Sequence, residues 1–181
     1  MSVVIRKMLL KGWTKEITRA ECRPETQTVH CIARLNENID EAIPYINAVL
    51  GGYTCIKNPP SVTFRSQGKL ISVHADHIAI NANKDAEEAE KILQWRKREI
   101  NDAWEKRDEI TPSYKAAPRP QPFTILKFLP KTNCGKCGFP TCMVFASMAV
   151  EGGKGAADCP DLTPEHKKEL DDYLSQFRFD Y

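Results

Sequence analysis

The chain has 181 residues and a nearly balanced charge, with 26 Lys and Arg against 24 Asp and Glu. A net charge of +2 gives no electrostatic reason to expect nucleic acid or an anionic membrane surface as a partner. No apolar run approaches the roughly 20 residues of a membrane-spanning helix. Arg6 and Lys7 interrupt the N-terminal segment where a secretory signal would need an apolar core. We therefore expect a cytoplasmic protein without a membrane span.

The N-terminal part of the chain is rich in segments typical of β-strands. β-Branched residues and turn signals predict strands over residues 3–10, 26–35, 61–65, 69–73 and 77–80. The segment 66–68 (Ser-Gln-Gly) predicts a hairpin turn between two of these strands. A helix is expected over residues 40–50, because Gly51 and Gly52 follow it where helices commonly end.

The longest predicted helix covers residues 85–110. Its apolar side chains recur at three- and four-residue steps, so they share one face that we expect to pack into a core. This face comprises Ala89, Ile92, Leu93, the stem of Arg96, Ile100, Ala103 and Trp104. The fold class predicted for the chain is α+β, with a small α+β domain that includes this long helix over residues 1–110.

Prolines mark the predicted domain boundary. Residues 111–122 contain four of them, at positions 112, 118, 120 and 122. Proline cannot continue a helix or donate a hydrogen bond in a sheet, so this segment is predicted to be an extended, partly stiff linker. We expect a second, mainly helical and loop domain over residues 123–181, with short helices over 142–150 and 164–177.

Four cysteines of the second predicted domain have the spacing C-x2-C-x4-C-x16-C. They are Cys134, Cys137, Cys142 and Cys159. Thiolates that each bind one iron of a cubic cluster must come from a chain that folds tightly around it, and three of these cysteines lie within nine residues. Gly135 and Gly138 would let backbone N–H groups approach the sulfurs.

Two alternative metal sites fit this spacing less well. Structural zinc sites with four cysteines usually combine two C-x2–4-C pairs, whereas sixteen residues separate Cys142 from Cys159. Plant-type 2Fe–2S sites run C-x4-C-x2-C, the reverse order of the short gaps. A cysteine followed by proline, as at Pro160, is common in bacterial 4Fe–4S sequences. We therefore favour one 4Fe–4S cluster over zinc.

The surroundings of these cysteines agree with a cluster. Thr141 is expected to cap the helix over 142–150, whose positive end would then face the cluster. Four apolar side chains either exclude water from the site or only fill the core of a small domain: Phe139, Met143, Phe145 and Met148. Three lysines either form a positive rim for an acidic partner or are ordinary solvated side chains: Lys131, Lys136 and Lys154.

The segment 129–146 (LPKTNCGKCGFPTCMVFA), with Asp-Cys-Pro at 158–160, resembles the 4Fe–4S domain at the start of the large subunit of corrinoid iron–sulfur proteins. It is also similar to a module in the B subunit of the Rnf electron-transport complex. The resemblance covers about residues 123–163 and implies that the four cysteines are the cluster ligands, which they match one for one. The resemblance does not extend to a corrinoid-binding domain. The whole chain resembles small iron–sulfur proteins of anaerobes.

We expect the cluster to serve in low-potential one-electron transfer to a redox partner protein. The resemblance suggests a corrinoid protein or a related anaerobic oxidoreductase as that partner. The chain would then be an electron carrier or an accessory protein rather than an enzyme. The alternative is a ligand-binding or sensing protein in which the cluster is structural or regulatory.

Five further residues carry potential metal ligands: Cys22, Cys31, Cys55, His74 and His77. No recognised ligand spacing relates them to one another. We expect inert thiols and ordinary histidines here rather than a second metal site.

Overall fold

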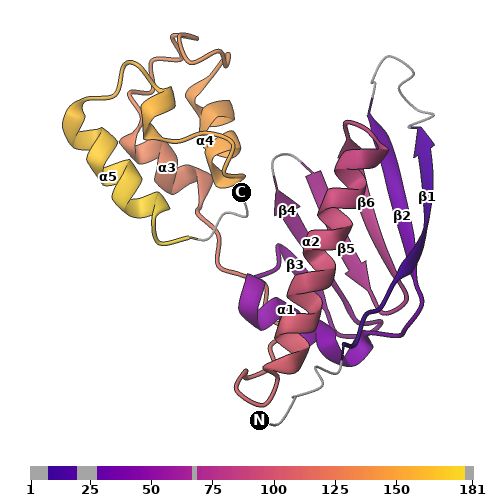
Figure 1. The fold of residues 1–181 in the computed structure, drawn as a ribbon. Helices are drawn as coiled ribbons and strands as arrows, with labels where there is room; N and C mark the ends of the chain where they lie inside the picture. The colour runs from indigo at the N-terminus through magenta and orange to yellow at the C-terminus, as the bar shows by residue number, and fades with distance from the viewer. Residues whose placement is uncertain (1–7, 20–27, 67–68, 178–181) are drawn as a thin grey trace, which may run out of the picture. The chain divides into compact units, whose positions relative to one another are not determined.

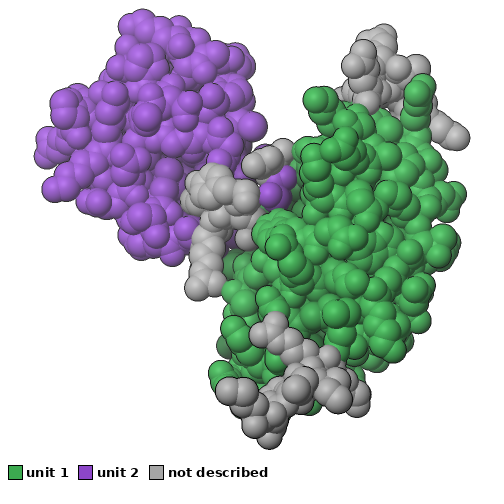
Figure 2. Space-filling view, viewed as in Figure 1, with its two compact units in different colours: residues 1–65, 69–117 green, residues 66–68, 118–181 purple. Residues whose placement is uncertain are grey.

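The computed structural model describes residues 8–19, 28–66 and 69–177. Within these ranges the chain combines α and β structure, with a six-stranded antiparallel sheet and five α-helices (Figure 1). The chain divides into two compact units, one formed by residues 1–65 and 69–117 and the other by 66–68 and 118–181 (Figure 2). None of the helices in the described ranges has both the length and the apolar character to cross a bilayer.

The sheet of the first unit has the strand order β1-β2-β6-β5-β4-β3. The strands are β1 (Trp13–Arg19), β2 (Val29–Leu35), β3 (Thr54–Ile56), β4 (Ser61–Ser66), β5 (Lys69–His74) and β6 (His77–Asn83). In β5, Ile71 and Val73 are buried while their neighbours are not, which is the alternation of a sheet with one covered face. Across the β5–β6 pair, Ile71 lies opposite Ile80.

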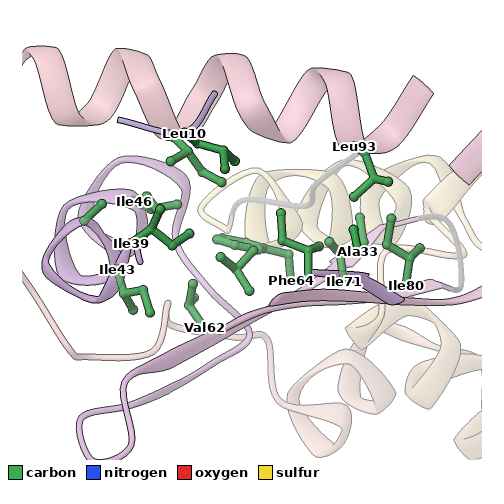
Figure 3. Packing of buried hydrophobic residues seen from close by; sticks show 14 of the residues in the cluster. Leu10, Ala33, Ile39, Ile43, Ile46, Val62, Phe64, Ile71, Ile80 and Leu93 are labelled. Carbon is green, nitrogen blue, oxygen red and sulfur yellow. The ribbon is translucent and has the colours of Figure 1, made fainter. Parts of the chain in front are cut away.

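The helices α1 (Ile43–Leu50) and α2 (Ala86–Glu105) contribute buried side chains to one apolar core together with the strands of the sheet. Figure 3 shows Leu93 of α2 facing the buried side chains of Ile71 and Ile80. The predicted apolar face of α2 is confirmed, because its buried residues are Ala89, Leu93, Arg96, Ile100 and Ala103.

Arg96 differs from the prediction, which placed only its stem on the apolar face of α2. The whole side chain is buried, at 1% exposure. Its guanidinium carbon lies 4.2 Å from the ring centroid of Phe64 and 4.4 Å from that of Trp95, and Nη1 donates to Glu99 at 2.9 Å. Contacts of this kind between a cation and aromatic faces offset the cost of burying the charge.

The predicted helix over 40–50 is confirmed as a 3-10 turn (Asp40–Ala42) followed by α1. Gly51 ends it in the left-handed region, with φ of 71°. Four predicted strands correspond to β2, β4, β5 and β6, and the turn residues 67–68 lie outside the described ranges.

The remaining strand predictions are corrected by the structure. The strand expected over 3–10 is wrong in its described part, since residues 8–10 are not β-structure, and residues 1–7 lie outside the described ranges. The sheet instead contains β1 and β3, which the sequence did not predict. The long helix α2 is confirmed but ends at Glu105 rather than at residue 110.

The second unit packs α3 (Pro122–Phe128), α4 (Cys142–Val150) and α5 (Pro164–Leu174) around its own apolar core. The prediction of α4 is confirmed, and α5 is shorter than the predicted 164–177. Helix α3 was missed because Pro122 was assigned to the linker. It occupies the first helical turn instead, where its fixed φ and missing N–H are tolerated.

Candidate metal centre

The four predicted cysteine ligands lie in two segments of the second unit. Two of them belong to residues 129–141, the cysteine loop, which connects α3 to α4. This loop curls tightly, since Lys131, Asn133, Gly135 and Gly138 all have positive φ, between 51° and 87°. The N–H of Gly138 donates to the carbonyl of Gly135 at 2.9 Å, which closes a turn around Cys137. A tight loop of this kind lets Cys134 and Cys137, three residues apart, line one site.

The third cysteine, Cys142, is the first residue of α4. The predicted cap is confirmed, because the hydroxyl of Thr141 accepts from the N–H of Val144 at 3.2 Å. The N–H of Cys142 donates to the side-chain oxygen of Asn133 at 2.9 Å. The start of α4 is thus attached to the middle of the cysteine loop, next to Cys134.

The fourth cysteine follows a 3-10 turn (Ala156–Asp158). The carboxylate of Asp158 accepts from the N–H of Gly155 at 2.8 Å and fixes this turn. Cys159 is 5% exposed, and burial raises the pKa of its thiol. Since a metal binds the thiolate, loading the site must release this proton.

All four cysteines line one hollow. Cys134 is exposed, Cys137 is half-buried, and Cys142 and Cys159 are buried. The other lining residues are Leu129, Pro130, Asn133, Gly135, Phe139, Thr141 and Phe145. The hollow encloses about 10 Å³, which is room for roughly one water molecule.

Apolar side chains close one side of this hollow. Phe139 and Phe145 pack edge to face, with their ring centroids 6.3 Å apart, and both line the hollow. Met143 and Met148, which were grouped with them in the sequence, are not among its lining residues. The two phenylalanines therefore exclude water from the buried side of the site.

The lysines near the cysteines do not form a simple positive rim. Lys136 pairs with Asp161 at 2.8 Å, and Lys154 pairs with Asp158 at 3.1 Å. The pKa of Asp161 is lowered, mainly by the hydrogen bond that Lys136 donates to its carboxylate. The Lys136–Asp161 pair also joins the cysteine loop to the segment of Cys159. Within the described residues, two of the three predicted rim charges are thus neutralised locally.

The remaining candidate ligands are dispersed in the first unit. Cys31 lies in its core at 1% exposure, Cys55 is half-buried, and Cys22 falls outside the described ranges. His74 and His77 stack with ring centroids 4.2 Å apart. Across the described part of the chain, no three His, Cys, Asp or Glu side chains converge as ligands of a single metal ion.

Comparison with protein families gives a match within the second unit. Residues 129–160 match a family described as "Putative Fe-S cluster". This segment includes all four cysteines of the hollow. The match covers a minor part of the chain and supports an iron–sulfur cofactor in this segment, while the type and number of clusters remain predictions.

Curated relatives share a similarly short region with this chain. The gamma 1 subunit of the acetyl-CoA decarbonylase/synthase complex of Methanosarcina thermophila is 50% identical over 46 residues, which is 25% of this chain and 10% of the relative. The gamma subunit of the same complex from Methanothermobacter thermautotrophicus is 39% identical over 51 residues, 28% of this chain and 11% of the relative.

A third relative, the gamma subunit of that complex from Methanocaldococcus jannaschii, is 51% identical over 45 residues, 24% of this chain and 9% of the relative. The matched regions thus span about a tenth of the length of these relatives. The predicted resemblance is confirmed as similarity to an iron–sulfur segment, and its assignment to corrinoid or Rnf proteins stays a prediction. No solved structure matches this chain significantly.

Proposed function

We propose that the second unit binds one 4Fe–4S cluster through Cys134, Cys137, Cys142 and Cys159, and that the protein transfers single electrons to a redox partner. The observation that carries this proposal is the presence of all four thiols on one hollow. A bound cluster would supply a one-electron couple at that position.

The spacing of the cysteines favours a cluster over a single zinc ion. The ligands of one zinc ion must approach a common point at about 2.3 Å from the metal, whereas the ligands of a cubic cluster each bind a different iron. Structural zinc sites with four cysteines usually combine two closely spaced pairs, whereas sixteen residues separate Cys142 from Cys159.

The burial of the thiols suits electron transfer. Cys142 and Cys159 hold the protected side, where Phe139 and Phe145 exclude water. Cys134 is exposed, so the same site reaches the surface where a partner can approach. The capped N-terminus of α4 contributes a positive dipole that stabilises added negative charge.

The chemistry of the ligands also supports a low reduction potential. Four thiolates place negative charge around the site, and this charge opposes reduction. The dipole of α4 offsets only part of that effect. We expect a potential negative of about −200 mV, within the roughly −700 to +450 mV that such clusters span.

The partner is proposed to be a protein. The curated relatives are named as subunits of a multi-subunit complex, which makes a protein acceptor the natural choice. By the resemblance, a corrinoid protein or another anaerobic oxidoreductase is the proposed acceptor. The chain itself then acts as a carrier or accessory protein of cytoplasmic redox metabolism.

Anaerobic purification followed by metal analysis tests the first part of the proposal. We expect about four iron and four sulfide per chain and a visible absorption band. Colourless protein with one tightly bound zinc would contradict the cluster.

Redox titration of the purified protein tests electron transfer separately. We expect dithionite to bleach the visible band and to produce a spin-half signal at low temperature. A cluster that is neither reduced nor oxidised between about −700 and +450 mV would favour the alternative. The cluster would then be structural or regulatory in a ligand-binding or sensing protein.

A further inference from the structure

A groove in the first unit lies between α2 and the edge strand β1. Its lining residues are Lys11, Gly12, Trp13, Lys15, Glu90, Gln94 and Lys97, and it has a volume of about 290 Å³. This volume is close to the lower end, roughly 300 Å³, of pockets that hold small ligands. The groove contains none of the four cysteines, so it is independent of the proposed cluster.

Two periodic rows of side chains form the groove. Trp13 and Lys15 are alternate residues of β1, so they point to the same side of the strand, and Lys11 lies just before it. Glu90, Gln94 and Lys97 are four and three residues apart, so they share one face of α2. Strand β1 is at the edge of the sheet, while α2 packs on β2 and β6, which leaves room between the two rows.

The side chains of the groove are organised by contacts across it. Lys15 Nζ lies 2.6 Å from the carboxylate of Glu90, and Gln94 donates to the same carboxylate at 3.0 Å. The hydrogen bond from Lys15, followed by that from Gln94, lowers the pKa of Glu90. Lys97 donates to the carbonyl of Lys11 and lies 5.8 Å from the ring centroid of Trp13. These contacts hold the ammonium groups at the groove.

The groove carries a surplus of positive charge. Its three lysines face one carboxylate of the lining, Glu90. Lys11 also lies 4.0 Å from Glu37, so one positive charge at the groove is left without a balancing carboxylate among the described residues. Surface lysines are usually dispersed and solvated, as Lys91 is on the same helix, with 73% of its side chain exposed. Of the groove lysines, Lys11 is similarly exposed, at 71%. The side chain of Lys15 is only 35% exposed and lies in the groove beside the flat ring of Trp13.

We propose that this groove binds a small organic anion with a flat ring, either an aryl phosphate or an aromatic dicarboxylate. The anionic oxygens would bind Lys15 and Lys97, and the ring would pack on Trp13. The net positive charge at the groove favours an anionic ligand. The first unit would then contribute a ligand-binding activity that does not require the cluster.

Calorimetric titration of the full-length protein with phenyl phosphate and, separately, with phthalate tests this site. We expect saturable binding of at least one probe, and the tighter of the two identifies the anionic group. The double variant Lys15→Gln/Lys97→Gln should weaken binding about tenfold or more. Lys91→Gln, on the same helix but outside the groove, should change it less than about twofold.

The opposite change is also informative. Glu90→Gln removes the only negative charge of the groove lining and releases Lys15, so it should strengthen binding several-fold. A purely structural role of Glu90 would not produce this gain. Trp13→Leu should reduce the affinity for phenyl phosphate more than that for inorganic phosphate. Circular dichroism of each variant controls for folding.

The proposal is overturned if neither probe shows saturable binding at millimolar concentration. It is also overturned if Lys91→Gln weakens binding as much as the double variant, since the effect would then come from general surface charge. Repeating the titration on protein with and without iron separates this site from the proposed cluster, because loss of the cluster should leave the affinity unchanged.

Discussion

The side-chain amide of Asn47 donates to the carbonyl oxygen of Ser113 at 2.7 Å, across 66 positions of the chain. The same amide donates to the carbonyl of Lys115 at 2.9 Å, and its oxygen accepts from the N–H of Gly52 at 3.0 Å. Asn47 lies in α1 and is only 2% exposed. A single buried side chain therefore holds the chain that follows α2 against α1.

Backbone hydrogen bonds extend this attachment. The N–H of Ser113 donates to the carbonyl of Pro44 at 3.0 Å, and the N–H of Ala117 donates to that of Gly52 at 2.9 Å. Residues 113–117 are thereby bound to the first unit. Only the four residues 118–121 separate Ala117 from the start of α3 at Pro122.

The first prediction concerns Asn47→Ala, which removes all three side-chain hydrogen bonds. Two carbonyls in a partly buried place and one buried N–H would lose their partner, and each such loss costs about 1 kcal/mol. We expect the free energy of unfolding of the first unit to fall by about 2–4 kcal/mol. Denaturant unfolding followed by circular dichroism measures this.

Limited proteolysis provides a second readout of the same variant. Cleavage near residues 113–117 should become faster in Asn47→Ala, because the segment is no longer held against α1. Asn36→Ala serves as the control, since Asn36 is exposed and its loss should cost less than about 0.5 kcal/mol. Equal effects of the two substitutions would show that Asn47 has no special role.

The second prediction divides the cysteines into two groups. Substitution of Cys134, Cys137, Cys142 or Cys159 by Ala should remove the cluster or leave a smaller, labile one, because each thiolate binds its own iron. Cys31→Ala and Cys55→Ala should retain the full iron and sulfide content. Iron and sulfide analysis of anaerobically purified variants, with circular dichroism as a folding control, measures this. A well-folded Cys55→Ala protein without iron would show that the ligand set is wrong.

The third prediction concerns the pair formed by Lys136 and Asp161, which lie 2.8 Å apart. Lys136 follows Cys134 by two residues, and Asp161 follows Cys159 by two. Lys136→Gln or Asp161→Asn should release the two cysteine segments from each other, so iron should be lost to a chelator several times faster. The exchanged pair Lys136→Asp/Asp161→Lys should restore much of the retention.

The reduction potential distinguishes charge from positioning in this pair. Removing the positive charge of Lys136 disfavours the more negative, reduced state, so the potential should become more negative by an amount on the order of tens of millivolts. Asp161→Asn should shift it in the positive direction. Shifts of the same sign in both variants would mean that altered folding, not charge, is responsible.

The fourth prediction concerns His74 and pH. Burial, and next the neighbouring His77, lower the pKa of His74, while Asp76 acts against them. The unfolded chain therefore binds a proton more readily than the folded one. The resulting contribution to stability is present above the ordinary pKa of about 6.5 and is lost as pH falls through the lower pKa of the folded state.

His74→Gln should accordingly reduce the loss of thermal stability between about pH 7 and pH 5. Melting temperatures measured across this range by circular dichroism test it. His30→Gln, also in the first unit, is the matched control and should follow the unmodified protein. An unchanged acid-side slope in His74→Gln would contradict the role assigned to this residue.

Several elements of the fold follow from local sequence alone. The apolar face of α2 was predictable because its core-facing residues repeat with the period of the helix. The start of α4 was equally local, since Thr141 caps it through the N–H of Val144 three residues away. Such features need no knowledge of distant residues.

The missed strands depend on distant partners. Strand β1 is rich in charged residues, as edge strands often are, and becomes a strand by pairing Trp13 with Leu35 and Arg19 with Val29. Strand β3 has only three residues, Thr54–Ile56, and exists through its pairing with β4. Neither length nor composition marks such segments, because the hydrogen bonds that define them come from another part of the chain.

The sequence by itself determined the spacing of the four cysteines and, through it, the prediction of an iron–sulfur centre, because ligand spacing within a short segment is a local property. Only the tertiary structure decided that Lys136 pairs with Asp161, that Asn47 holds Ser113, and that Lys15 and Lys97 meet at one groove. These relationships join residues 25 to 82 positions apart. Their energies depend on where the chain folds back, which no local pattern encodes.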